Sequence, residues 1–397
     1  MGQLKDKANS IFCGLFIYLA ATSFINQDVY AFTVRFASVL IFLVLGLIAL
    51  PYFADDIRNK DVGLILAVMT VVFTVIFVLA TGSGYGAAFI PSDLALICYV
   101  EKRMRLGSSE IRLISFAGAL PVILWYSHVR WSYNFNMAGF TFMIMAFFAM
   151  ILVELTGSGI KLPGSESVPR MLIEYRQFIE GIIFVTAFIL SMLYHSRTVM
   201  IGMIMFIAIY ALFGVMSTSV LCYRILFLTA SVGAAVFTLI YIKFAGLFGG
   251  VTFLYKDVFS GREGIWRELW GAFLSSPVTG IGSSYELKSF EIFEVHNGMF
   301  DILTVHGIIV FTLIIILLFR MFERCRPDSL HKSNPGGSDP GIKPQEEGMV
   351  RIRRLALSAA FAMMFTSWFE NFFTVPPYSI IFMSFVLIAD PGTGNRG

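Results

Sequence analysis

Three side chains in polar segments of this sequence have chemistry suited to a reactive site: Arg197, Arg262 and His296. Arg262 follows Gly261, which lets the backbone approach a ligand closely, and it precedes a predicted helix whose N-terminus attracts anions. Arg197 lies in a tight turn between two apolar runs. An imidazole, with an unperturbed pKa of about 6.5, can take a proton from a hydroxyl near neutral pH. These residue types indicate anion binding beside proton abstraction.

The segment from Asp257 to Gly307 must position Arg262 and His296. Within it, the stretch from Glu263 to Phe273 carries apolar residues at helical spacing, namely Ile265, Leu269, Trp270 and Phe273. This pattern predicts a short amphipathic helix lying against a membrane surface, where it would form a wall or lid. Breaker residues follow the helix, and the next apolar run begins at His296-Asn297.

Composition indicates that the rest of the chain is a membrane protein. The sequence is 57% hydrophobic and 14% charged, with a mean hydropathy of +0.79. A soluble core cannot bury so much apolar surface, and a membrane-spanning helix needs about 20 apolar residues. We expect an all-α polytopic protein of about twelve spans, the fourth of them short and interrupted by Pro91. The runs are centred near residues 18, 42, 70, 92, 120, 145, 183, 206, 231, 308, 361 and 381.

The distribution of Lys and Arg predicts the orientation of these spans. Placing the N-terminus in the cytoplasm puts most of the 29 Lys and Arg residues on the cytoplasmic side and the loop before His296 outside. The expected organisation is spans one to nine in 1–244, an outer loop in 245–296, span ten in 297–319, a disordered basic linker in 320–354, and the last two spans with a cytoplasmic tail in 355–397. Both termini are therefore expected in the cytoplasm.

Four short patterns within the outer segment occur in a fixed order. They are Ser260-Gly261-Arg262, then Ile265-Trp266, then Phe273 with Pro277, Gly280 and Gly282, and finally His296-Asn297 with Phe300 and Gly307. This series resembles the large periplasmic loop of bacterial O-antigen ligases and of O-antigen or exopolysaccharide polymerases. The resemblance implies a glycosyltransferase C-type fold in the bacterial inner membrane, with its active site facing the periplasm.

The resemblance also implies a reaction. It is transfer of a glycan from undecaprenyl pyrophosphate to a sugar hydroxyl, with inversion, without a metal and without a cofactor. His296 would be the base, while Arg262 and Arg197 would hold the pyrophosphate; a similar Ser-Arg pair carries a pyrophosphate-binding arginine in the ligases. Arginine can replace a divalent metal here through bidentate hydrogen bonds. The outer loops contain no Asp-x-Asp pattern that would suggest a metal.

Further polar residues near the outer interface are candidates for substrate binding. Charges close to hydrocarbon are costly, so each is a functional hypothesis, although some long side chains merely reach the headgroups. His306, inside the tenth span, is expected to be a buried structural residue. The substrate-binding candidates are Arg267, Asn297, Arg35, Glu370 and Asp93, of which the last three are also candidates to pair with the arginines.

Several functions remain open at this stage. A ligase would use the lipid A-core oligosaccharide as acceptor, whereas a polymerase would use a second lipid-linked glycan. We favour the ligase because the outer loop is compact and the chain ends soon after its twelfth span. A transporter would instead place polar residues at mid-membrane in paired broken helices, and only Pro91 and Asp93 point that way. Expected partners are the lipid-linked glycan donor, one of these acceptors and membrane lipid, but no nucleic acid.

Overall fold

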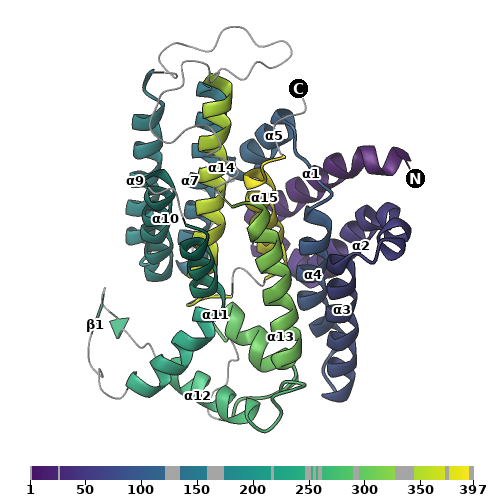
Figure 1. Cartoon of the computed structure of the whole chain (residues 1–397). Coiled ribbons are helices and arrows are strands. Elements are labelled where there is room, and N and C mark those ends of the chain that lie inside the picture. The colour runs from purple at the N-terminus through teal and green to yellow at the C-terminus, as the bar shows by residue number, and fades with distance from the viewer. Residues whose placement is uncertain are drawn as a thin grey trace.

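Apolar runs rich in Leu, Ile, Val and Phe form the helices of the computed structural model (Figure 1). The structure describes residues 2–25, 27–120, 135–158, 174–215, 219–245, 252–253, 256–257, 262–288, 295–326, 344–371 and 375–392. The first half contains α1 (Gly2–Ile25), α2 (Gln27–Arg58), α3 (Val62–Ala80), the 3₁₀ turn η1 (Tyr85–Ala88), α4 (Phe89–Glu101), α5 (Ser108–Ala119), α7 (Phe135–Gly157) and α9 (Arg176–Leu193). The second half contains α10 (Arg197–Val215), α11 (Val220–Phe244), β1 (Thr252–Phe253), β2 (Lys256–Asp257), α12 (Arg262–Phe273), α13 (Gly298–Arg324), α14 (Pro344–Thr366) and α15 (Pro376–Ala389).

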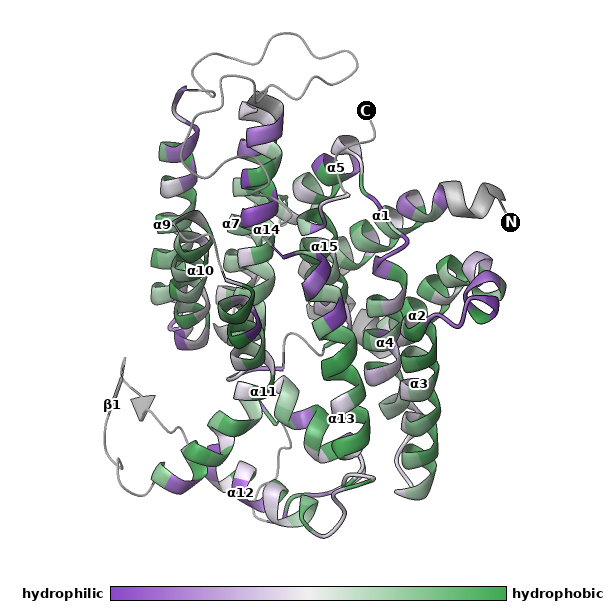
Figure 2. Cartoon of the chain, in the orientation of Figure 1, coloured by the Kyte–Doolittle hydropathy of each residue, from purple (hydrophilic) through white to green (hydrophobic). Residues whose placement is uncertain are grey.

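The protein is a helical membrane protein. Among the described residues, six helices are long and apolar enough to cross a bilayer, and three shorter apolar helices accompany them. Figure 2 shows that hydrophobic residues cover most of the length of these helices. The expected fourth span is short, because α4 has 13 residues and reaches only about 20 Å. The total of twelve spans and their orientation remain predictions.

The centre of the bundle is formed by α14 and α15. Every residue of α15 is buried, and the second half of α14 is buried almost completely. In contrast, α9 and α3 expose rows of large apolar side chains, as expected of helices that face lipid. The segment predicted to be a disordered linker is helical at both ends, because α13 extends to Arg324 and α14 begins at Pro344. Residues 327–343 between them lie outside the described residues.

Two contacts show that α11 and α13 run antiparallel. The hydroxyl of Tyr223, near the start of α11, donates to the carbonyl of Phe322 near the end of α13 (2.6 Å). At the other end, the amide of Asn297 donates to the hydroxyl of Thr238 (2.9 Å). This end of the bundle also carries α12 and the short antiparallel pair β1 and β2 (Figure 1).

The predicted amphipathic helix is present as α12, and three of its side chains are buried against the protein. Trp266, Leu269 and Phe273 are buried, and α12 packs against α11 and α13. Ile265 and Trp270, which were also expected on the apolar face, are only partly buried. Part of the apolar face of α12 therefore packs on the protein, and the position of this helix at a membrane surface remains a prediction.

A break at Gly307 divides α13 into two parts. Gly307 has φ 82° and ψ 168°, a conformation essentially restricted to glycine. The loop after α12 satisfies the backbone groups that the break exposes: Ile281 N–H donates to Thr304 O (2.9 Å), and Ile308 N–H donates to Pro277 O (2.9 Å). Irregular backbone of this kind is tolerated in membrane proteins where protein groups supply the missing hydrogen bonds. The part of α13 that follows His296 is thus a separate short helix, Gly298 to His306.

Candidate active site

The carboxylate of Glu370 connects Arg262 and His296. Nη2 of Arg262 donates to Oε1 of Glu370 at 2.8 Å, and Nδ1 of His296 lies 3.0 Å from Oε2 of the same carboxylate. The side chain of Glu370 is 7% exposed, whereas those of Arg262 and His296 are 17% and 24% exposed. The carboxylate is therefore buried beneath a cation and an imidazole that both reach the surface.

This arrangement sets the charge state of Glu370. Burial by itself would raise the pKa of Glu370, but the hydrogen bond with His296 and the positive charge of Arg262 outweigh it. The pKa of Glu370 is consequently held below its ordinary value. A group that remains an anion near neutral pH can accept hydrogen bonds from both neighbours at once.

Three separate elements bring these side chains together. Arg262 is the first residue of α12, and its Nη1 also donates to the carbonyl of Phe369. Glu370 follows the end of α14, where the indole of Trp368 donates to Ala230 O of α11 at 3.0 Å. His296 precedes the short helix that begins at Gly298. In the sequence, His296 lies 74 residues before Glu370, and Arg262 lies 108 residues before it.

The backbone at His296 is in the left-handed region, with φ 53°. That conformation costs a residue with a Cβ atom about 1–2 kcal/mol, so neighbouring contacts must hold it. Both neighbours of His296 are fixed by such contacts. Trp266 Nε1 donates to Val295 O at 2.6 Å, and Asn297 is bound to α11. Strained backbone of this kind is common at functional sites.

Asn297, predicted to bind substrate, has its side chain fully buried and occupied by protein contacts. Its Oδ1 accepts from Phe300 N–H at 3.0 Å, which caps the short helix. Its Nδ2 donates to Ala234 O at 3.1 Å and to Thr238 Oγ1 at 2.9 Å. Asn297 thus joins the short helix to α11.

Arg197 lies at the same end of the bundle as Glu370. It is the first residue of α10, and Gly202 on α10 lies against Thr366, the last residue of α14. The helices α10 and α14 run antiparallel, because Phe213 contacts Phe361 while Gly202 lies against Thr366. Since a helix rises 1.5 Å per residue, Arg197 lies roughly 7.5 Å beyond Gly202 toward the end of the bundle that carries Glu370. Its side chain is partly buried. Arg197 and Glu370 therefore lie toward the same end of the bundle, and a shared role with Arg262 remains a prediction.

The other predicted residues either lie apart from Glu370, Arg262 and His296 or fall outside the described residues. Arg267 is exposed on α12. Asp93 is buried within α4, and neither of its oxygens has a hydrogen-bond partner among the described residues. The side chain of Arg35 lies outside the described residues. The structure therefore brings together His296, Arg262 and Glu370 directly.

Two supporting residues were not identified from the sequence. Trp266 belongs to the Ile265-Trp266 pattern, but helical spacing alone did not mark it as buried. Thr238 is a fully buried threonine in the middle of an apolar helix, and nothing in its local sequence indicates a partner 59 residues away. A polar residue inside an apolar run was the available signal for Thr238.

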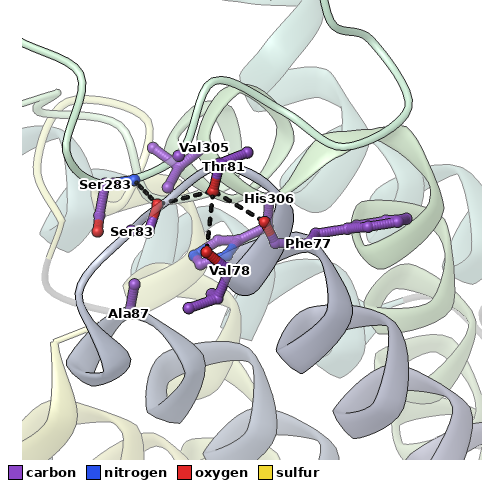
Figure 3. A pocket seen from close by; sticks show the side chains of 9 residues that line it. Phe77, Val78, Thr81, Ser83, Ala87, Ser283, Val305 and His306 are labelled. Carbon is purple, nitrogen blue, oxygen red and sulfur yellow. Dashed lines mark hydrogen bonds between the residues drawn. The ribbon is translucent and has the colours of Figure 1, made fainter.

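A small pocket lies beside the break in α13 (Figure 3). It is a shallow, partly open hollow between α3, η1, the loop at Gly282 and His306. Two of its hydroxyl groups are hydrogen-bonded to each other, since Oγ1 of Thr81 and Oγ of Ser83 lie 2.8 Å apart, and Oγ of Ser83 also accepts from Ser283 N–H at 2.9 Å. His306 is buried there, as predicted. These contacts fasten the loop after α12 to the end of α3.

The described part of the chain contains no group of three or more His, Cys, Asp and Glu residues that could hold a metal ion. The expected absence of a metal from the reaction stays a prediction. Comparisons of the chain with known protein families, with curated proteins and with solved structures found no match.

Proposed function

We propose that the protein is a membrane glycosyltransferase that moves a glycan from a lipid-linked pyrophosphate to a sugar hydroxyl. The observation that carries the proposal is the single carboxylate of Glu370 between Arg262 and His296. In such a reaction the leaving group departs as an anion while a hydroxyl loses its proton. The guanidinium of Arg262 suits the first task and the imidazole of His296 suits the second. The order of motifs around Arg262 and His296 supports the same reaction class.

Arg262 would bind the pyrophosphate. A guanidinium has five N–H donors in a planar fork, and the contacts with Phe369 O and Glu370 use one N–H on each terminal nitrogen. We expect the remaining donors, which make no other hydrogen bond with the described residues, to bind phosphate oxygens. Because Glu370 neutralises much of the charge of Arg262, a second cation is needed, and Arg197 is our candidate. Together they would stabilise the departing pyrophosphate.

His296 would be the general base. In the tautomer with hydrogen on Nδ1, the ring donates to Glu370, and Nε2 is the nitrogen that takes the proton from the acceptor hydroxyl. The carboxylate fixes this tautomer and stabilises the imidazolium that forms, as in other carboxylate and histidine pairs. The deprotonated oxygen then attacks the anomeric carbon, the bond to pyrophosphate breaks, and one direct displacement inverts that carbon.

We propose that the acceptor is the lipid A-core oligosaccharide at the periplasmic face of a bacterial inner membrane. The protein would then be an O-antigen ligase, with no cofactor. An O-antigen or exopolysaccharide polymerase would use the same donor and the same three side chains. The two acceptors are both sugar hydroxyls on membrane-anchored molecules, so a genetic experiment is needed to distinguish them.

Deletion of the gene, followed by gel analysis of the surface polysaccharide, tests this function. Loss of a ligase should leave full-length chains on the lipid carrier and lipid A-core without polysaccharide. Loss of a polymerase should leave single repeats attached to lipid A-core. Complementation with wild-type protein should restore the pattern, and complementation with His296→Ala should not. Unchanged polysaccharide in the deletion strain would contradict the proposal.

A further inference from the structure

Thr238 connects the body of the bundle to the residue next to His296. It is fully buried on α11, and its hydroxyl donates to Ala234 O one turn earlier (3.1 Å). The same hydroxyl oxygen accepts a hydrogen bond from Nδ2 of Asn297 at 2.9 Å. The side-chain amide of Asn297 therefore rests on a site formed by Ala234 and Thr238.

This contact bears directly on the conformation of His296. The ring of His296 contacts Glu370 from a backbone conformation with φ 53°. Left-handed backbone at a residue with a Cβ atom relaxes unless its neighbours are held. The preceding residue, Val295, is held through its carbonyl by Trp266 of α12. The following residue, Asn297, is held through its side chain by α11.

We propose that Thr238 is a positioning residue for His296, acting through Asn297. This inference rests on the proposed function, since it assumes that the orientation of His296 limits the transfer step. Removing the hydroxyl would leave Nδ2 of Asn297 with Ala234 O as its one remaining partner on α11. The peptide after His296 would then relax, and the imidazole would lose its alignment with Glu370 while Arg262 keeps its place on α12.

The test compares Thr238→Val with Thr238→Ser, which retains the hydroxyl. Thr70→Val is the matched control, because Thr70 is equally buried, its hydroxyl also donates one turn back along its own helix (2.8 Å to Leu66 O), and it lies on α3. The proteins are reconstituted in nanodiscs with a lipid-linked glycan donor and a lipid A-core acceptor. Turnover at saturating donor and the KM for donor are measured separately.

A misplaced catalytic group costs about 10- to 100-fold in rate, so Thr238→Val should lower kcat by about that factor with little change in donor KM. Thr238→Ser and Thr70→Val should turn over like the wild type. Normal kcat in Thr238→Val would overturn the inference, as would an equal loss in Thr70→Val. If Thr238→Val does not fold, Thr238→Ala serves as the second variant, because it also removes the hydroxyl that accepts from Asn297 and should give the same loss of kcat.

A second measurement separates this inference from the proposed function. Protein labelled with ¹⁵N at histidine reports the tautomer of each ring, and His296→Gln assigns the resonance of His296 among the five histidines. The wild type should show the tautomer with hydrogen on Nδ1, and Thr238→Val should shift toward the spectrum of Glu370→Gln. If the wild type transfers no glycan, the proposed function fails, and this spectrum still decides the role of Thr238. An unchanged His296 resonance in Thr238→Val would overturn it.

Discussion

Oε2 of Glu370 lies 3.0 Å from Nδ1 of His296, although 74 residues separate them in the chain. The other oxygen of the same carboxylate binds Arg262. One buried anion thus sets both the orientation of an imidazole and the position of a guanidinium. The consequences of this arrangement can be measured separately for stability, for donor binding and for proton transfer.

Replacement of Glu370 by Gln should destabilise the protein in a pH-dependent way. The pKa of Glu370 is lowered in the folded state, so its contribution to the free energy of unfolding is present above the unfolded value of about 4.3. That contribution is lost as the pH falls through the lower folded pKa. Thermal unfolding in detergent should show a difference between the wild type and Glu370→Gln near pH 7 that shrinks below about pH 4. A difference that does not change with pH would contradict the linkage.

Arg262→Ala should abolish transfer and weaken donor binding, and Arg262→Lys should restore little of either. An ammonium is a point charge and cannot reproduce the planar fork that reaches Phe369 O, Glu370 and a phosphate together. Arg197→Ala should also abolish transfer. Donor binding and initial rates in nanodiscs provide the measurement.

Arg224→Lys is the control, because Arg224 forms an exposed pair with Glu323 at the opposite end of α11. Full activity in Arg262→Lys would indicate simple charge attraction.

Gly307→Ala should destabilise the N-terminal part of α13. A Cβ atom there would collide with the carbonyl of Val278, and φ 82° is unfavourable for any residue with a side chain. We expect a loss of about 2 kcal/mol or more in the free energy of unfolding, measured by chemical denaturation. Gly271→Ala on α12 is the control, because a Cβ atom at Gly271 would meet nothing within 4 Å and alanine favours helix. Equal stability of the two variants would show that the break at Gly307 is not fixed by glycine.

Transfer by the purified protein should survive an excess of chelator. In the proposed reaction Arg262 and Arg197 hold the leaving group, so a divalent cation has no required role. Rates are measured before and after incubation with chelator, and then after addition of magnesium or manganese. Loss of transfer that is restored by either metal would exclude the arginine-only mechanism.

The sequence predicted the local features of this site better than its long-range contacts. Helical spacing identified α12, and the start of an apolar run identified the junction at His296. Neither pattern contains information on residues far away in the chain, so the bridge from Arg262 through Glu370 to His296 was not predicted, although Glu370 was a candidate partner for an arginine. The burial of Trp266 and the role of Asn297 as a helix cap depend on how α11 packs, which only the folded chain reveals.

The rate of glycan transfer by His296→Ala tests the central claim most directly. Purified wild type and variant are given a labelled lipid-linked glycan and the acceptor in nanodiscs, and donor binding is measured in parallel. Loss of a general base should reduce the rate by about 10²- to 10⁴-fold, with near-normal donor binding because the arginines remain. The deficit should become smaller at alkaline pH, where solvent takes over part of the proton removal. Normal turnover of His296→Ala at saturating donor, with weakened donor binding, would contradict the account and leave His296 a substrate-positioning residue.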